Sequence, residues 1–171
     1  MHKIKNVLIG ITGSIAAFKI PELVRLFKKE KFNVKIIQTK SSLDFVSPLT
    51  LSVLSENKVL SSTITNEKTW NNHVSLSNWA DIFIIAPLTA NTLAKMANGQ
   101  CDNLLLATYL STKCKTYVAP AMDLDMFQHH TTKTNLLSIE KHGIKIIPAK
   151  FGELASGLIG DGRMAEPQEI F

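Results

Sequence analysis

Short apolar runs alternate along the chain with longer segments in which apolar residues recur at helical spacing. Such runs, rich in β-branched residues, are typical of buried strands, and the segments between them are typical of amphipathic helices. The predicted strands are residues 5–10, 33–39, 82–86, 115–119 and 144–147. The predicted helices are residues 15–29, 48–55, 103–110 and 131–142, with shorter ones before residue 80 and after residue 92. Pro21 lies inside the first helix and is expected to kink it or to cost it a hydrogen bond.

This alternation predicts one α/β domain over residues 1–171, with a mainly parallel sheet and helices on both faces. We therefore expect a Rossmann-like or flavodoxin-like three-layer sandwich. In such folds, ligands bind at the carboxyl ends of the strands, so the residues that follow each predicted strand are the first candidates for a functional site.

The strand predicted at residues 82–86 leads directly into polar residues at a helix start. Pro87 has no N–H to donate to a sheet ladder, so we expect the strand to end there. Thr89, Asn91 and Thr92 follow, and their hydroxyl and amide groups precede the apolar residues of the next helix. Small polar groups between a parallel strand and a helix are typical of ligand sites in open α/β sheets. A binding site is therefore predicted here.

The first two strands and the helix between them form a βαβ unit whose loops favour a phosphate. The turn Gly10–Ser14 lacks the Gly-x-Gly-x-x-Gly dinucleotide fingerprint, and the second strand ends at Thr39–Ser42 instead of at an acidic residue for a ribose diol. Hydroxyls and a lysine suit an anion, to which Ser14 can add its N–H and hydroxyl. The alternative is that Ser14 only caps the helix and that Ser41 and Ser42 only form a turn.

Other polar residues are open to two interpretations each. His73 stands alone in a polar loop, where a solvated side chain is the commoner role. Asp123 and Asp125 follow the fourth predicted strand, where acidic residues favour a helix start. The nearby Met126 either fills the core or lines an apolar pocket. The glycine-rich segment at residues 152–167 is either an unstructured end or a lid over a site.

Composition narrows the classes of function. The formal charge is +5, but the lysines are scattered without interleaved aromatic residues, so we expect a phosphorylated small molecule and no nucleic acid. No apolar stretch reaches the roughly 18–20 residues of a membrane span. Residues 1–17 are interrupted by polar residues and glycine and do not form a signal peptide, so we expect a cytoplasmic protein. Cys101 and Cys114 lack metal-ligand spacing and are expected to be buried, unpaired thiols.

Taken together, the motifs resemble the homo-oligomeric flavin-containing cysteine decarboxylases, in particular phosphopantothenoylcysteine decarboxylases and the N-terminal half of the bifunctional coenzyme A enzymes of bacteria. Each motif is weak alone, but their order and spacing cover nearly the whole chain. The matching segments are residues 13–17, 39–41, His73 before 79–81, 86–92 (Ala-Pro-Leu-Thr-Ala-Asn-Thr), 101–104, 119–122 (Ala-Pro-Ala-Met) and 160–167 (Gly-Asp-Gly-Arg-Met-Ala-Glu-Pro).

The resemblance implies FMN as the cofactor and His73 as the catalytic histidine. It implies that hydride passes from the cysteine Cβ to FMN, that CO₂ leaves the resulting thioaldehyde, and that the reduced flavin returns hydride. The implied substrate is 4′-phosphopantothenoylcysteine and the product is 4′-phosphopantetheine. By family position, FMN is held by Gly13, Ser14, Ile15, Thr39, Ser41, Thr89, Ala90, Asn91, Thr92 and Ala121.

The same resemblance implies a homotrimer, or a homododecamer of four trimers, with FMN near a subunit interface. It assigns substrate contacts to Asp123, Met126 and Ala155. It also places Ser156 at the position of the catalytic acid, in a flap at about residues 151–167.

Two of these positions depart from the family pattern. Asp123 replaces an asparagine that binds the substrate carboxylate. An ionised aspartate would repel that carboxylate. The repulsion would be removed if Asp123 were protonated or paired with a lysine. Ser156 replaces a cysteine that protonates the substrate, and a hydroxyl is a far weaker acid than a thiol. We interpret the pair as a coherent variant of the same enzyme. The alternatives are a peptidyl-cysteine decarboxylase, a flavin prenyltransferase and a flavin-binding regulatory subunit without catalysis.

Overall fold

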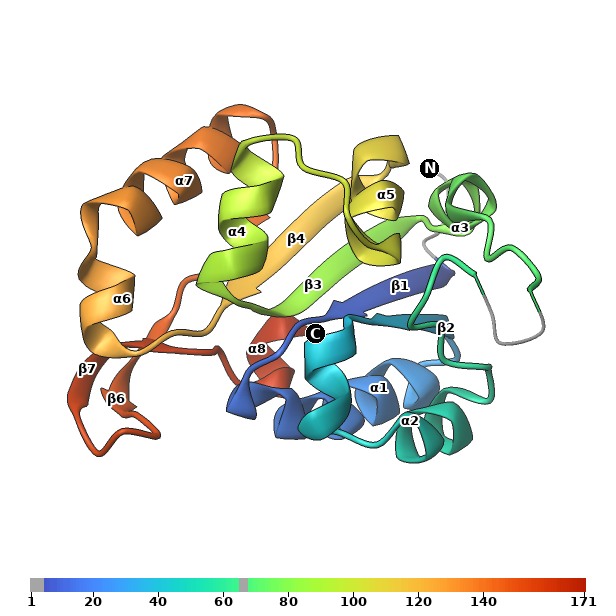
Figure 1. Cartoon of the computed structure of the whole chain (residues 1–171). Coiled ribbons are helices and arrows are strands. Elements are labelled where there is room, and N and C mark those ends of the chain that lie inside the picture. Colours follow the sequence, from blue (N-terminus) through green and yellow to red (C-terminus); the bar gives the residue numbers. More distant parts are fainter. Residues whose placement is uncertain (1–4, 65–67) are drawn as a thin grey trace.

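A computed structural model describes residues 5–64 and 68–171 of the chain. Its main sheet has five parallel strands in the order β2-β1-β3-β4-β5 (Figure 1). They are β1 (Asn6–Ile11), β2 (Asn33–Gln38), β3 (Ile82–Leu88), β4 (Lys115–Pro120) and β5 (Lys145–Ile146). This order confirms the predicted flavodoxin-like fold and places the change of strand order between β1 and β3, which is where such sheets bind ligands.

Helices cover both faces of the sheet (Figure 1). On one face lie α1 (Ile20–Lys29), α2 (Pro48–Ser55) and α8 (Pro167–Ile170). On the other lie α3 (His73–Trp79), α4 (Ala90–Ala97), α5 (Leu104–Ser111) and α7 (His130–Lys141). The short 3₁₀ helices η1 (Ile15–Lys19) and η2 (Lys40–Asp44) follow β1 and β2, and α6 (Leu124–Gln128) follows β4. Several helices therefore begin next to the carboxyl ends of the strands.

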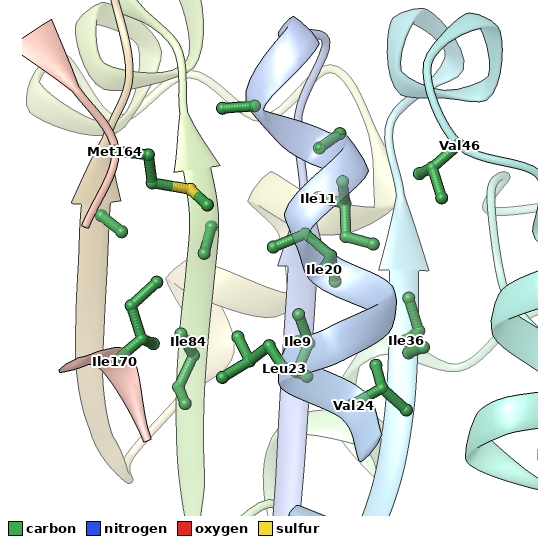
Figure 2. Packing of buried hydrophobic residues seen from close by; sticks show 14 of the residues in the cluster. Ile9, Ile11, Ile20, Leu23, Val24, Ile36, Val46, Ile84, Met164 and Ile170 are labelled. Carbon is green, nitrogen blue, oxygen red and sulfur yellow. The ribbon is translucent and has the colours of Figure 1, made fainter. Parts of the chain in front are cut away.

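Each central strand sends alternate side chains to opposite faces of the sheet, as strand geometry requires. On β1, Ile9 and Ile11 join the cluster beneath α1, whereas Leu8 joins the cluster on the other face. Figure 2 shows the first cluster, in which Ile20 and Leu23 of α1 lie over this strand. Burial on both faces is the reason that the strands were recognisable as unbroken apolar runs.

The prediction that β3 ends before Pro87 is wrong. The strand continues to Leu88. The Ala86–Pro87 peptide bond is cis, and the pairing of β3 with β4 shifts register between Ile85 and Leu88. Pro87 therefore lies at an irregularity of the ladder, a place that tolerates the missing N–H, and not at its end.

The helix predicted at residues 15–29 is divided near Pro21. Residues Ile15–Lys19 form a separate 3₁₀ helix, and α1 begins only at Ile20. Pro21 thus occupies the first turn of α1, where a backbone N–H would have no helical partner in any case. The predicted single helix is two helices, and the proline marks the junction.

The C-terminal segment has more regular structure than its sequence predicted. It forms an antiparallel hairpin from β6 (Lys150–Glu153) and β7 (Ile159–Arg163), followed by α8. The buried positions of β7 are occupied by Gly160 and Gly162, and its other positions are exposed. Burial therefore alternates along β7, although hydrophobicity does not. This is why the sequence did not predict the strand.

The expectation of two buried thiols is wrong for Cys101, which is exposed, and both cysteines are free. Cys114 is partly buried, and this burial raises the pKa of its thiol. Across residues 5–64 and 68–171, no three His, Cys, Asp or Glu side chains are grouped so as to hold a metal ion. None of the helices described here combines the length and apolar character needed to cross a bilayer.

Candidate functional site

Thr12 joins the loops that follow β1 and β3. Its buried hydroxyl donates to the carbonyl oxygen of Pro87 at 2.6 Å and accepts from the N–H of Thr89 at 3.1 Å. The bridge lies where the strand order changes, so it fixes the spacing of the two loops that open α/β sheets use for ligands. Thr12 was not among the site residues predicted from the sequence. Its signal was a hydroxyl directly after a buried strand and before a glycine.

The loop after β1 meets the loop after β2 at Gly13. The Thr39 and Ser41 hydroxyl oxygens lie 3.2 Å apart, at the start of η2. A Cβ added to Gly13 would lie 2.5 Å from the Ser41 Oγ. Because Gly13 has no side chain, the loop after β1 can lie directly against the loop after β2. The structure thus brings together three residues that the sequence predicted as one site.

The start of α4 adds further polar groups. Thr89 is the N-cap residue, and its hydroxyl accepts from the N–H of Thr92 at 3.3 Å. Ala90 and Asn91 form the first turn, where backbone N–H groups have no carbonyl partner within the helix. The helix dipole also favours negative charge at this end. The geometry therefore suits an anion.

These loops surround a cavity of about 580 Å³, which we call the hydroxyl cavity. Its lining includes Thr39, Lys40, Ser41, Asn91, Thr92 and Lys95. Lys95 forms an ion pair with Asp102, which also lines the cavity. Hydroxyl, amide and ammonium donors on one wall are the groups that bind a phosphate. Of the residues predicted to bind a phosphate, Thr39, Lys40 and Ser41 line this cavity, whereas Ser14 lines a second one.

A second cavity, of about 410 Å³, lies between the loop after β4 and the C-terminal hairpin, and we call it the hairpin cavity. Ser14, Ile15, Ala121, Asp123 and Ala155 line it, and all five were predicted as site residues. Its wall also includes the apolar residues Phe18, Met122, Leu154 and Met164 and the charged residues Lys19, Glu153 and Arg163. An apolar wall with a few charged groups is typical of a small-molecule site.

Two residues of this wall also cap helices. The Ser14 hydroxyl accepts from the N–H of Ala16 at 3.2 Å and caps η1. The Asp123 Oδ1 accepts from the N–H of Leu124 at 2.6 Å at the start of α6. The two interpretations drawn from the sequence, capping and site, are therefore compatible: each residue begins a helix and lines the cavity.

A buried lysine connects the cavity to the chain beyond the hairpin. Lys19 is 8% exposed, and its ammonium donates to the Met164 carbonyl at 3.1 Å and to Glu166 Oε1 at 2.8 Å. Arg163 donates to the same carboxylate oxygen at 2.8 Å. The hydrogen bond from Lys19, reinforced by the charges of Lys19 and Arg163, lowers the pKa of Glu166. The sequence did not predict this cluster, because only one local feature, a lysine beside apolar residues in η1, indicates it.

Two glycines seat the hairpin on the cavity wall. The Met122 N–H donates to the Gly162 carbonyl at 3.0 Å. Gly162 has φ of +135°, and a Cβ there would lie 2.3 Å from the Met122 carbonyl oxygen. A Cβ on Gly160 would lie 2.4 Å from a Leu124 methyl carbon. Close approach at both positions holds β7 against α6 and the loop before it, so the base of the predicted flap is well packed.

Six predicted site residues are not part of the lining of either cavity. Gly13, Thr89 and Ala90 belong to the loops and the helix start beside the hydroxyl cavity, whereas Ser156, Met126 and His73 lie elsewhere. Ser156 is exposed in the turn of the hairpin, where its hydroxyl accepts from the Leu158 N–H at 3.4 Å. Met126 is 51% exposed on α6. His73 is the first residue of α3, which packs against α5 at the end of the sheet where β3 begins (Figure 1).

His73 has a buried ring nitrogen without a partner. Its Nδ1 makes no hydrogen bond within the part of the chain that the structure describes. The Trp70 ring packs edge-on against the imidazole, with ring centroids 5.8 Å apart. An unpaired buried polar atom costs about 1–3 kcal/mol.

A family model matches the sequence from end to end. The model described as Flavoprotein covers residues 1–171. The chain belongs to the flavoprotein family. This agrees with the cavities of the fold, which lie where flavodoxin-like sheets bind their ligands.

Two curated relatives show the range of activities around this flavoprotein. A cysteine/cysteine sulfinic acid decarboxylase from an unknown prokaryotic organism is 52% identical over 126 residues, which are 73% of this chain and 35% of that protein. This flavoprotein thus spans about a third of that relative's length. A probable phosphopantothenoylcysteine decarboxylase of Streptococcus mutans is 36% identical, with 97% of this chain and 94% of that protein covered.

Two solved structures share the fold of the flavoprotein over nearly its full length. A mutant PPC decarboxylase, with cysteine changed to serine and complexed with pantothenoylaminoethenethiol, matches with a TM-score of 0.87 and 39% identity, covering 98% of this chain and 94% of that one. The FMN-binding protein AtHal3 matches with a TM-score of 0.83 and 39% identity, covering 98% and 93%.

Proposed function

We propose that this flavoprotein binds FMN and decarboxylates 4′-phosphopantothenoylcysteine to 4′-phosphopantetheine, a carboxy-lyase reaction of coenzyme A biosynthesis. The observation that carries the proposal is the likeness to a PPC decarboxylase complexed with pantothenoylaminoethenethiol, at a TM-score of 0.87. The name and similar length of the Streptococcus mutans relative support it. The likeness to the FMN-binding protein AtHal3 supports the choice of flavin.

The residues around the two cavities fit FMN. The bare backbone at Gly13, the hydroxyls of Thr39 and Ser41, and the free N–H groups at the start of α4 suit its phosphate. The apolar wall of the hairpin cavity suits its ring. Bound there, FMN would supply a reversible acceptor for the hydride of the cysteine side chain. We assign its binding to Gly13, Ser14, Ile15, Thr39, Ser41, Thr89, Ala90, Asn91, Thr92 and Ala121.

We assign the cysteine end of the substrate to the hairpin cavity. Asp123 and Ala155 line it, and the hairpin contributes part of its wall. Arg163 also lines it and offers a cation for the substrate carboxylate. Met126 and Ser156 lie outside the cavity, so they would touch substrate through movement of the hairpin tip or through contact with another copy of the chain.

We propose that His73 serves the site of a neighbouring copy in a homotrimer or a dodecamer of trimers. Both cavities are lined without α3, and the buried Nδ1 has no partner within the described chain. Trp70 and Val74, beside it, are 58% and 44% exposed. A second copy that covered this apolar surface would bring the imidazole close to the site of that copy.

A cytoplasmic location fits the cysteines. Both Cys101 and Cys114 are free. Unpaired thiols are typical of proteins kept in a reducing compartment. The proposed substrate is a small phosphorylated metabolite, and the proposal includes neither a nucleic-acid nor a membrane partner.

One observation favours a second substrate. The relative that is 52% identical over 126 residues is named for cysteine and cysteine sulfinic acid, substrates with a free amino group. The carboxylates of Asp123 and Glu153 in the hairpin cavity are suitable partners for such an ammonium group. Free cysteine is therefore the second candidate.

The test is to incubate the FMN-loaded protein with 4′-phosphopantothenoylcysteine and, separately, with L-cysteine, and to measure CO₂ and the mass of each product. Equal amounts of CO₂ and 4′-phosphopantetheine are expected from the first substrate. Cysteamine formed from L-cysteine, with no reaction of the first, would favour the second candidate. Bound FMN without turnover of either substrate would contradict both and favour a regulatory flavin-binding subunit.

A further inference from the structure

We propose that Asp123 is the acid that protonates the substrate carbon from which CO₂ leaves, a role that rests on the decarboxylase function proposed above. The balance of the reaction requires such an acid. The bond between that carbon and the carboxylate breaks, CO₂ departs, and a proton must be added to the same carbon. Bound FMN would supply both the acceptor and the donor of one hydride, so the overall reaction involves no net oxidation and needs no outside reductant.

The hairpin cavity offers few groups that can deliver this proton. Of its charged residues, Arg163 stays protonated in proteins. The buried ammonium of Lys19 is engaged with the Met164 carbonyl and with Glu166. Glu153 lines the cavity but is exposed to solvent on β6. Asp123 is the half-buried carboxyl group of the cavity wall.

Ser156 does not supply the proton in this structure. It is exposed and lies outside the lining of the cavity, and its hydroxyl oxygen accepts a hydrogen bond from the Leu158 N–H. A serine hydroxyl is also too weak an acid to protonate carbon at a useful rate near neutral pH. The acid must therefore lie elsewhere in the wall.

The contacts of Asp123 leave its side chain available to a bound substrate. Its Oδ1 accepts from the Leu124 N–H, and none of the ion pairs formed by the described residues involves it. A substrate carboxylate beside Asp123 disfavours a second negative charge there and so favours the protonated form, against the opposing effect of the Lys19 and Arg163 charges in the same wall. When CO₂ leaves, that repulsion ends, and Asp123 can release its proton to the adjacent carbon.

The decisive variant is Asp123→Asn, with Asp125→Asn as its matched control. Asparagine caps helices as well as aspartate does, so the start of α6 is preserved. Asp125 is exposed on the same helix and lines neither cavity. Bound FMN, measured by absorbance, verifies that each variant is folded. Each is mixed anaerobically with 4′-phosphopantothenoylcysteine, and the product mass and flavin spectrum are followed.

Asp123→Asn is expected to release CO₂ in the first turnover but to stop at the enethiol, which is lighter than 4′-phosphopantetheine by two hydrogens, with the flavin left reduced. The rate of forming the complete product should fall about 100-fold or more. Asp125→Asn should behave as the wild type. Complete product from Asp123→Asn at the wild-type rate overturns the assignment, as does an equal loss in Asp125→Asn.

A second readout needs no turnover. The serine analogue of the substrate keeps the carboxylate but lacks the thiol, and its binding is measured by calorimetry in buffers of different ionisation enthalpy. The wild type and Asp125→Asn should take up protons on binding, and Asp123→Asn should not. Equal uptake by all three proteins contradicts the proposal. If the wild type with bound FMN releases no CO₂, the function proposed above fails and this role with it; if only the Asp123 results disagree, the role alone fails.

Discussion

The Lys19 ammonium and the Glu166 carboxylate lie 2.8 Å apart and join η1 to the chain that leaves the hairpin. Lys19 is almost fully buried, whereas the Glu166 side chain is 41% exposed. Leaving a buried cation without its counter-ion costs free energy of folding. The Glu166 carboxylate therefore stabilises the fold more than is usual for such an exposed carboxylate. The pair therefore anchors the end of the hairpin beside the cavity.

Glu166→Gln should destabilise the fold by about 1–3 kcal/mol, because Lys19 keeps its charge and loses an ionic partner. The matched control is Glu56→Gln, which breaks the exposed ion pair with Lys28 and should cost about 0.5 kcal/mol or less. Urea denaturation monitored by fluorescence measures both. Equal effects of the two substitutions would show that burial of Lys19 does not matter.

The contribution of Glu166 should depend on pH. Its pKa is lowered in the folded state, chiefly by the Lys19 hydrogen bond. The stabilisation is therefore present above the ordinary carboxylate pKa and is lost as the pH falls through the lowered folded value. The stability difference between the wild type and Glu166→Gln should be constant near neutral pH and shrink in acid. A difference that stays unchanged at low pH would refute the ionic origin.

Thr12→Val should destabilise the protein by about 1–3 kcal/mol and weaken flavin binding. The substitution keeps the side-chain shape but removes the hydroxyl that serves both the Pro87 carbonyl and the Thr89 N–H. Thr12→Ser, which keeps the hydroxyl, should retain most of the stability. The melting temperature and the FMN dissociation constant are the measurements, and a valine variant as good as the serine variant would show that the bridge is dispensable.

Gly13→Ala should weaken FMN binding about 10- to 100-fold, the equivalent of about 1–3 kcal/mol of overpacking. The new Cβ would lie 2.5 Å from the Ser41 Oγ, and one of the two loops must move. Gly152→Ala is the control, because its Cβ would lie 3.4 Å from the nearest Arg163 atom. Fluorescence titration with FMN measures the affinities. Unchanged affinity in Gly13→Ala would place the phosphate elsewhere.

His73→Asn should retain FMN and lose turnover, and mixing should restore part of the activity. If His73 serves a neighbouring copy, then His73→Asn chains supply intact flavin sites and Gly13→Val chains supply intact histidines. The mixture, unfolded and refolded together, should form sites that contain both. Activity no greater than the sum of the two separate proteins would mean that each chain uses its own histidine.

The sequence predicted the central strands and the hydroxyl cavity because their signals are local. An apolar run such as residues 82–86 reports burial on both faces, and polar residues after it lie at the carboxyl edge of the sheet. The resemblance to a family predicted Ser14, Ala121 and Ala155 as site residues, and in the structure these three residues line one cavity. Their distance in sequence is large, so no local pattern relates them.

The parts that the sequence did not predict depend on contacts between distant residues. The hairpin was not predicted because glycines occupy the buried positions of β7. Glycine is needed there because Met122 and Leu124 approach the strand closely. The Lys19–Glu166 pair spans nearly the whole chain. The register shift that carries β3 past Pro87 depends on its pairing with β4. None of these can be recognised from residue types alone.

The central claim is that the loops after β1, β2 and β3 bind FMN. The most direct test is the absorbance spectrum of the purified protein, followed by fluorescence titration with added FMN. The account predicts a yellow protein with one FMN for each chain, released in a form that matches authentic FMN by mass. A colourless protein that does not bind added FMN would contradict both the assigned site and the proposed reaction.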